Sequence, residues 1–131
     1  MTVAILALTL AGCKGTPTSA TANVPFSIVD IRVGTGTEAT SGRSATITYA
    51  GYLYSSSGTD NKGTPFDAGT FSFIVGGNQV IAGFSQGVQG MRVGGFRRVI
   101  IPPSLGYGSQ ANGPIPANST LVFEIELINV Q

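Results

Sequence analysis

The last segment of the chain, residues 120–130, alternates apolar and polar side chains with a period of two. Its apolar members are Leu121, Phe123, Ile125 and Leu127, and the acids between them are Glu124 and Glu126. Successive side chains of a β-strand point to opposite faces of the sheet, so this pattern predicts a strand with one buried face. Because half-buried strands are typical of antiparallel sheets, the fold is expected to contain such a sheet.

Four more segments have a β-rich composition or the same alternation: residues 26–33, 43–54, 71–75 and 96–101. Turn-forming residues separate them, since glycine accounts for 19 of the 131 residues. Residues 55–65 are rich in Ser, Gly and Asn and are predicted to be a polar loop. The sequence therefore predicts five strands.

One segment has helical spacing. Ile81, Phe84 and Val88 lie at positions i, i+3 and i+7, and Gly90 follows as a C-cap. Two helical turns are unstable in isolation, so this helix is expected to lie on the sheet. Five strands and one short packed helix predict an α+β architecture.

Two features of the composition restrict the chemistry. The chain has no His, which excludes Ser-His-Asp and Cys-His catalysis and removes the commonest metal ligand. Its single cysteine, Cys13, excludes an intrachain disulfide and a Cys-cluster zinc site. The net charge of +1 gives no electrostatic basis for binding nucleic acid. We expect neither a metal nor a cofactor.

The N-terminal residues have the character of an export signal. Residues 3–10 form an apolar run that is too short to span a bilayer and has the length of a signal-peptide core. It ends in Leu10-Ala11-Gly12-Cys13, which resembles the bacterial lipobox, in which the cysteine is lipidated and becomes the mature N-terminus. No Lys or Arg precedes the run, and a fold-forming strand is the alternative interpretation. We expect residues 1–13 to be a lipoprotein-like signal segment with Cys13 as the lipidation site.

Residues 14–24 are rich in Thr, Ser and Ala and show no apolar period, so they are predicted to be a flexible tether. Such a segment spans about 18 Å on average, by the estimate of ~5–6 Å × √n. Residues 25–131 would then form a single domain held close to a membrane of the bacterial cell envelope, facing the periplasm or the exterior.

Five motifs resemble, in order, those of the FKBP-type peptidyl-prolyl cis-trans isomerases. They are residues 47–51 (ITYAG), 64–67 (TPFD), 76–84 (GGNQVIAGF), 94–108 (GGFRRVIIPPSLGYG), and 115–116 (IP) with 121–127 (LVFEIEL). The match extends from about residue 24 to residue 130. The resemblance implies a curved antiparallel sheet wrapped around one short helix, in agreement with the predicted strand count.

Carried over position by position, the resemblance also implies the site. The catalytic residues would be Tyr49, Asp67, Tyr107 and Phe123, and the substrate-binding residues would be Phe66, Phe71, Val80, Ile81, Phe84 and Ile115. Phe84 would form the floor of the pocket. The backbone N–H of Ile81 and the hydroxyl of Tyr107 would hold substrate carbonyls.

Spacing alone supports a plainer interpretation of several of these residues. Phe71, Phe84 and Phe123 would be core residues on sheet or helix faces, and Asp67 would be a turn residue. Tyr107 lies between two glycines in a loop, which is an unusual place for a purely structural aromatic side chain.

Three features depart from the better-known members of the family. The predicted floor is Phe84, where many members have Trp, and residues 55–64 form an extra polar loop. Four residues, 67–70, separate Phe66 from Phe71, so the longer flap of the family is missing. With it goes a basic residue that often pairs with the pocket acid, so Asp67 is expected to be less firmly oriented.

The resemblance implies peptidyl-prolyl cis-trans isomerase activity on X-Pro bonds, here of exported or envelope proteins. Its partners would be proline-containing polypeptides, macrolide inhibitors and, through the lipid anchor, a membrane. No helical dimerisation arm precedes the domain, so a monomer is expected. The alternatives are a catalytically weak chaperone or a Pro-segment binding module with the same groove, and a purely structural β-domain.

Overall fold

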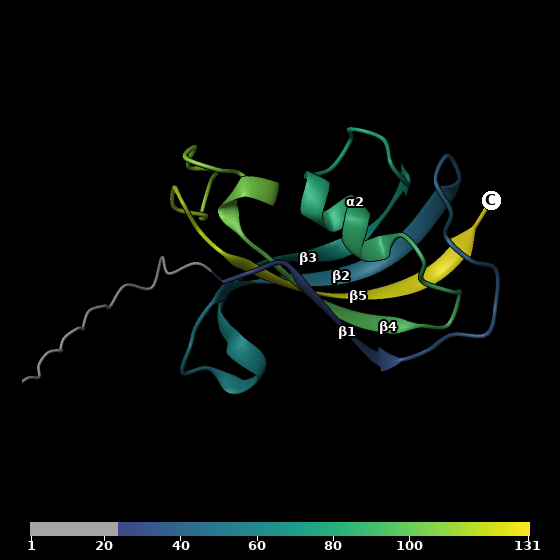
Figure 1. The fold of residues 1–131 in the computed structure, drawn as a ribbon, viewed down its shortest axis with the longest axis horizontal. Coiled ribbons are helices and arrows are strands. Elements are labelled where there is room, and N and C mark those ends of the chain that lie inside the picture. Colours follow the sequence, from purple (N-terminus) through teal and green to yellow (C-terminus); the bar gives the residue numbers. More distant parts are fainter. Residues whose placement is uncertain (1–23) are drawn as a thin grey trace, which may run out of the picture.

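The computed structural model describes residues 24–131 (Figure 1). In this part of the chain the elements are β1 (Ser27–Arg32), β2 (Ser44–Tyr54), β3 (Lys62–Ile74), α2 (Ala82–Val88), β4 (Phe96–Ile101) and β5 (Leu121–Val130). Two short 3-10 turns, η2 (Thr59–Asn61) and η3 (Pro103–Leu105), lie in the connections. The predictions for residues 1–13, including lipidation of Cys13, lie outside the described residues, as does nearly all of the predicted tether.

The five strands form one antiparallel sheet in the order β1-β4-β5-β2-β3. Figure 1 shows the sheet curving around α2, which lies on its concave side. The α+β prediction of a curved five-stranded antiparallel sheet wrapped around one short helix is therefore confirmed. No helix within residues 24–131 is long and apolar enough to cross a bilayer.

The hydrophobic core fills the space between α2 and the concave face of the sheet. Its buried members include Ala45, Ile47, Phe73, Phe84, Val88, Val99, Ile101, Leu121, Ile125 and Leu127. The apolar residues of the alternating C-terminal segment all belong to this set or to the pocket above it, so the period-two pattern correctly assigns the buried face of β5.

Two glycines let α2 approach the sheet closely. A Cβ atom at Gly83 would lie 2.5 Å from Cγ2 of Ile101, and one at Gly87 would lie 2.8 Å from Cγ2 of Val99. Each glycine costs a helix interior about 0.5–1 kcal/mol relative to alanine. The seven-residue helix therefore owes its stability to packing on the sheet.

The ends of α2 each differ by one residue from the prediction, which has Ile81 as its first helical position and Gly90 as its C-cap. Ile81 is the N-cap with extended backbone angles, and the helix ends at Val88 with Gln89 as the C-cap. Gly90, which was predicted as the C-cap, is the next residue and has a φ of 90°. Glycine is favoured there because other residues rarely adopt the left-handed region.

Strand β3 differs from the prediction. It has 13 residues, begins at Lys62 and ends at Ile74. The predicted polar loop therefore ends at η2, and residues 71–74 of the predicted strand 71–75 form only the last part of β3. The pairing of Tyr54 with Lys62 and of Tyr52 with Pro65 extends the ladder to the end of β2. The small residues in this stretch show no apolar period, so only their pairing with β2 marks them as strand.

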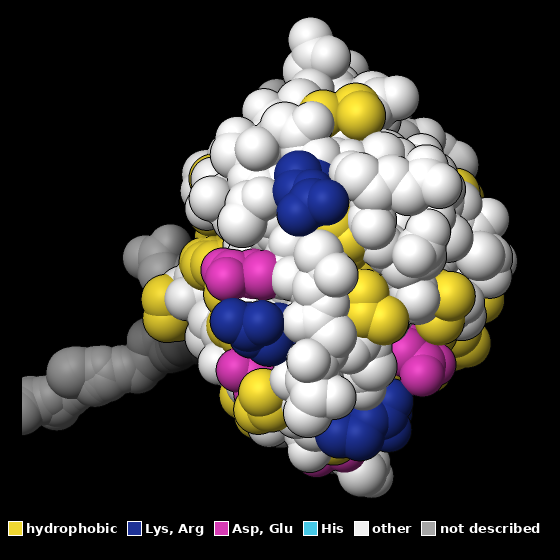
Figure 2. All heavy atoms as spheres, turned by 90° about the vertical axis from the view of Figure 1, so that its right-hand side faces the viewer, with side chains coloured by type: hydrophobic (Ala, Val, Ile, Leu, Met, Phe, Trp, Pro, Cys, Tyr) yellow, Lys and Arg dark blue, Asp and Glu magenta, His cyan; other side chains and the backbone are white. Residues whose placement is uncertain are grey.

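The surface carries charges of both signs side by side. On the face shown in Figure 2, basic and acidic side chains neighbour one another and the hydrophobic side chains form small separate groups. The larger exposed hydrophobic residues include Val29 and Val33, which are 51% and 71% exposed, in and just after β1.

Candidate active site

Phe84 from α2 lies at the centre of a cluster of aromatic rings. Its side chain is 3% exposed, and its ring meets that of Phe123 from β5 edge to face at a centroid distance of 5.0 Å. The rings of Tyr49 and Phe71 each lie 5.9 Å from it. Edge-to-face and tilted pairs at these distances are favourable beyond the area they bury. Phe84 is thus a fixed apolar floor.

The walls come from three strands. Tyr49 and Phe71 lie on β2 and β3 with their rings 5.5 Å apart and nearly perpendicular. On the other side, Phe66 of β3 and Phe123 of β5 pair edge to face at 5.6 Å. This second pair meets above Gly51, where a Cβ atom would lie 2.8 Å from each ring. A side chain at residue 51 would push the rings apart, which explains the glycine in the ITYAG motif.

Asp67 and Tyr49 form a short hydrogen bond at the rim. The Tyr49 hydroxyl donates to Oδ2 of Asp67 at 2.6 Å, and the backbone N–H of Ala68 donates to Oδ1 at 2.9 Å. Asp67 lies opposite Gly51 in the ladder, next to a β-bulge, because the following residue of β2, Tyr52, pairs with Pro65. Two donors and a paired backbone therefore orient the carboxylate, although the basic partner that the resemblance associates with it is missing.

The same contact perturbs Tyr49. Burial raises the pKa of its hydroxyl to about 12, and the hydrogen bond to Asp67, the charge of Asp67 and the charge of Tyr107 add to the increase. The hydroxyl is therefore protonated at neutral pH and is a donor to Asp67.

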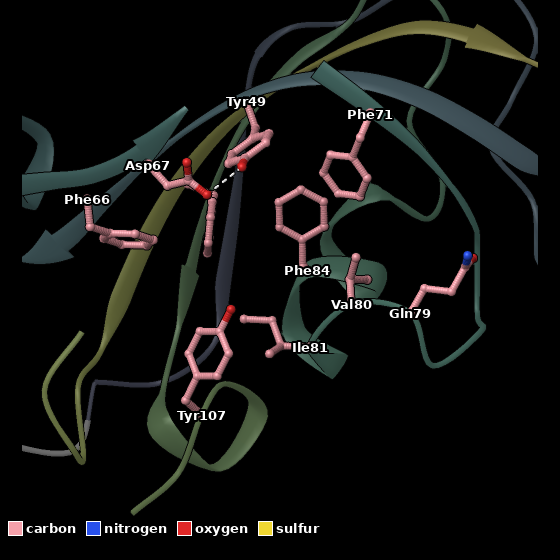
Figure 3. Close-up of a pocket in the computed structure, with 10 residues that line it drawn as sticks. Tyr49, Phe66, Asp67, Phe71, Gln79, Val80, Ile81, Phe84 and Tyr107 are labelled. Carbon is pink, nitrogen blue, oxygen red and sulfur yellow. Dashed lines mark hydrogen bonds between the residues drawn. The ribbon is translucent and has the colours of Figure 1, made fainter. Parts of the chain in front are cut away.

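The remaining rim is formed by the segment before α2 and by the loop after β4. Gln79, Val80 and Ile81 lie on one side, and Gln79 accepts the backbone N–H of Ile74 through Oε1 at 2.7 Å. Tyr107 follows η3 and lies on the other side, facing Ile81 (Figure 3). The carbonyl of Ile81 accepts the N–H groups of Phe84 and Ser85 at the start of the helix.

Together these residues line a pocket of about 320 Å³ that is open to solvent (Figure 3). It is lined by Tyr49, Phe66, Asp67, Phe71, Gln79, Val80, Ile81, Phe84, Tyr107 and Phe123. All the predicted site residues of the domain except Ile115 are in this lining. The Ile115 side chain is 4% exposed and packs in the core, so its assignment to substrate binding stays a prediction. Gln79 was not predicted, although it lies within the GGNQVIAGF motif.

Arg97 of β4 holds the other end of the helix. Its guanidinium donates to the carbonyls of Gly87 and Gln89 at 2.9 and 3.1 Å and to Asp30 of β1 at 2.7 Å. A cation at a helix C-terminus also interacts favourably with the helix dipole. Arg98 points to the opposite face, where it binds Glu124 and Asp60. Because successive side chains of a strand point to opposite faces, the two arginines form no joint anion site.

The chemistry that this pocket offers follows from its lining. Six aromatic rings provide an apolar, partly dehydrated surface, and the polar groups are few and fixed. No imidazole is present in the sequence, and the described residues contain no cluster of potential metal ligands. The fold and site define a small domain with an open apolar pocket of aromatic side chains and a few polar groups at its rim.

Comparison with known proteins identifies the family. Residues 35–128 match the sequence profile of the FKBP-type peptidyl-prolyl cis-trans isomerases, and the chain belongs to this family.

Two relatives and one solved structure show how much of the chain this similarity covers. FK506-binding protein 3 of Candida albicans is 47% identical over 106 residues, which cover 78% of this chain but only 23% of the relative. The FK506-binding protein of Neisseria meningitidis is 38% identical over 109 residues, which cover 79% of this chain and 94% of the relative. The crystal structure of FkpA from Escherichia coli superimposes with a TM-score of 0.68 at 31% identity, covering 81% of this chain and 48% of that one.

Proposed function

We propose that this chain is a peptidyl-prolyl cis-trans isomerase that acts on X-Pro bonds of polypeptides. The observation that carries the proposal is the aromatic pocket built on Phe84, which has the size and polarity for a proline ring. Membership of the isomerase family supports the same reaction.

The energy required is within the reach of such a pocket. Rotation about the peptide bond has a barrier of ~18–20 kcal/mol, which comes from amide resonance. Uncatalysed exchange takes about 10–100 s, so a turnover of ~10 s⁻¹ requires about 4 kcal/mol of transition-state stabilisation. The planar amide is charge-separated and favoured by water, whereas the twisted amide has lost that polarity. An apolar pocket that fits the twisted form can therefore supply much of the difference.

Two groups on the rim are suited to hold the substrate carbonyls on either side of the rotating bond. The N–H of Ile81 lies before the first turn of α2, and within residues 24–131 no acceptor takes it. The hydroxyl of Tyr107 lies across the pocket from it. If both flanking carbonyls are held, the X-Pro peptide bond between them is positioned for rotation, and no covalent bond has to break.

The turnover of short X-Pro peptides tests this function. We expect acceleration above the buffer rate, nearly constant between about pH 6 and pH 8 and insensitive to EDTA, because the sequence has no His to titrate there and the mechanism needs no metal. A bell-shaped pH profile near neutrality would contradict the mechanism. Peptide binding without acceleration would favour the alternative, a Pro-segment binding module or weak chaperone.

The N-terminal sequence supports a proposal about where in the cell the protein lies. We propose that Cys13 carries a lipid and that residues 14–24 tether the domain to a membrane of the bacterial cell envelope, where its substrates would be exported proteins. Macrolides are proposed inhibitors because two relatives carry the name FK506-binding protein. In the native host, Cys13→Ser should release the protein from the membrane fraction or block its processing, because one side chain holds the anchor. A wild-type protein that is entirely soluble and uncleaved would contradict this proposal.

A further inference from the structure

The acidic side chains of this protein are almost all paired with a cation. The chain has six acids, and all of them lie within the described residues. The ion pairs are Asp30–Arg97, Glu38–Arg92, Asp60–Arg98, Glu124–Arg98, Glu124–Lys62 and Glu126–Arg32. Within residues 24–131, Asp67 is the acid that has no Lys or Arg nitrogen within 4.0 Å.

Asp67 is also placed where a ligand can reach it. Its side chain is exposed at the rim of the pocket, between Phe66 and Tyr49 (Figure 3). One oxygen accepts the Tyr49 hydroxyl and the other accepts the N–H of Ala68. A carboxylate has about four acceptor positions, so each oxygen keeps a lone pair for a further donor. These two bonds fix the carboxylate without neutralising its charge.

We propose that Asp67 makes the site selective for substrates in which a Lys or Arg flanks the proline, an inference that rests on the proposed function. Adjacent Cα atoms of the substrate are about 3.8 Å apart, and the stem of lysine is long enough to reach the rim from a proline seated on Phe84. The ammonium or guanidinium then forms an ion pair with the free lone pairs of Asp67. The ring of Phe66 beside it offers an apolar face along which the stem can pack.

The contact adds to recognition by the aromatic pocket and does not replace it. The pocket binds the proline ring whatever its neighbours are, whereas the rim carboxylate distinguishes cationic from neutral and anionic neighbours. Because Asp67 is exposed, the selectivity is modest and depends on salt. The preferred substrate class is therefore a basic, proline-containing polypeptide segment.

The test uses the whole chain and peptides that differ only in the residue beside the proline: Lys, norleucine or Glu, placed before it in one series and after it in another. Norleucine keeps the lysine stem and lacks the charge. In at least one series, kcat/KM for the Lys peptide should exceed that for the norleucine peptide by about two- to five-fold at low salt, and Glu should fall below norleucine. Raising NaCl to about 0.5 M should bring the Lys-to-norleucine ratio close to one.

Two variants identify the group responsible. In Asp67→Asn the Lys-to-norleucine ratio should fall to about one, whatever happens to the overall rate, because the amide keeps the shape and loses the charge. Glu38→Gln removes the same charge from a residue that does not line the pocket, and it should keep the wild-type ratio. An equal fall in both variants would assign the selectivity to net charge and overturn the proposal.

The outcomes separate this inference from the proposed function. Equal acceleration of the Lys and norleucine peptides at low salt in both series would overturn the selectivity and leave the isomerase activity standing. No acceleration of any peptide would remove both.

Discussion

Phe84 and Phe123 belong at once to the core and to the pocket, since only 3% and 5% of their surface is exposed. The other aromatic lining residues, such as Phe66 and Phe71, keep more of their surface open to solvent. Substitutions in these two groups should therefore differ. Changes at the buried rings affect stability and binding together, whereas changes at the rim affect binding mainly.

Phe123→Ala tests whether the aromatic wall of the pocket contributes to catalysis. Loss of the ring opens the pocket beside Phe66 and Phe84, so kcat/KM for X-Pro peptides should fall on the order of ten-fold or more, equivalent to about 1.4 kcal/mol or more. The free energy of unfolding should also fall, by about 3–5 kcal/mol, because a buried ring is removed. Rates are compared at a temperature at which circular dichroism shows both proteins folded.

Phe96→Ala is the matched control. Phe96 lies on β4 outside the pocket, with Arg32 over its ring. Its loss should leave kcat/KM close to the wild-type value. An equal loss of activity in both variants would show that general destabilisation, and not the wall of the pocket, explains the result.

Tyr49 provides a prediction about pH. Its pKa is raised from 10.0 to about 12 in the folded protein, so the folded state holds the phenolic proton more tightly than the unfolded chain. This contribution to stability is complete below about pH 10 and is lost as the pH rises through about 12. The difference in phenolate absorbance between the wild type and Tyr49→Phe reports the ionisation of Tyr49. Its midpoint should lie near pH 12, under conditions in which circular dichroism shows a folded protein. A midpoint near pH 10 in the folded protein would contradict the burial and hydrogen bonding of this hydroxyl.

Helix α2 carries the floor of the pocket, and its position depends on contacts at its far end. Arg97 joins the last carbonyls of the helix to Asp30 on the edge strand β1. The side chain of Arg97 is only 11% exposed. The guanidinium of Arg97 therefore links the end of the helix to β4 and β1, two strands that also pair in the sheet.

Arg97→Gln should accordingly destabilise the protein more than a change at an exposed arginine. The carbonyls of Gly87 and Gln89 lose their donor, which costs about 1–3 kcal/mol in the free energy of unfolding. Arg92→Gln breaks the exposed pair with Glu38 and should cost about 0–1 kcal/mol. Urea unfolding of the two variants measures the difference, and equal losses would contradict the proposed contribution of Arg97.

The elements differ in how far the sequence predicts them. Strand β5 and helix α2 are visible because their apolar residues repeat with the period of the structure, at Phe123 and Ile125 or at Phe84 and Val88. The first half of β3 is not, because Gly63 and the small residues after it carry no period and become strand only by pairing with β2.

The candidate site likewise contains residues that the sequence predicts and residues that it does not. The aromatic lining could be predicted because the motifs carry it, but Gln79 and the position of Ile115 depend on how two loops fold around the rim. The two donors to Asp67 were also not predictable, since they depend on the β-bulge that shifts the register of β3 next to Gly51.

The whole domain is expected to be a monomer. Residues 24–131 contain a five-stranded sheet and a hydrophobic core, so we expect this fragment to fold without the N-terminal segment. Within residues 24–131, β1 and β3 are the outer strands of the sheet, and such edges can pair with another copy. Asp30 and Arg32 place charges on β1 and Pro65 interrupts the donors of β3, which are recognised protections against pairing. The mixed charges on the face in Figure 2 likewise offer no broad apolar contact.

Light scattering of this fragment at micromolar concentrations should therefore give the mass of one chain at every dilution. A mass that rises with concentration would contradict the monomer and would identify one of the two edges as an interface. A Lys substitution at Val29 on β1, which is 51% exposed, would then distinguish between the edges.

The close packing of Gly83 and Gly87 on the sheet has a practical consequence for detecting ligands. A seven-residue helix that contains two glycines does not persist once the sheet beneath it opens, so the pocket floor and the whole fold should melt together. Any molecule that occupies the pocket then stabilises the entire domain, by about 2.7 kcal/mol at 100 times its Kd. In a domain of this size, that corresponds to a rise of several degrees in the melting temperature. Heating curves therefore measure occupancy of the pocket, even for molecules that contain no rotatable prolyl bond.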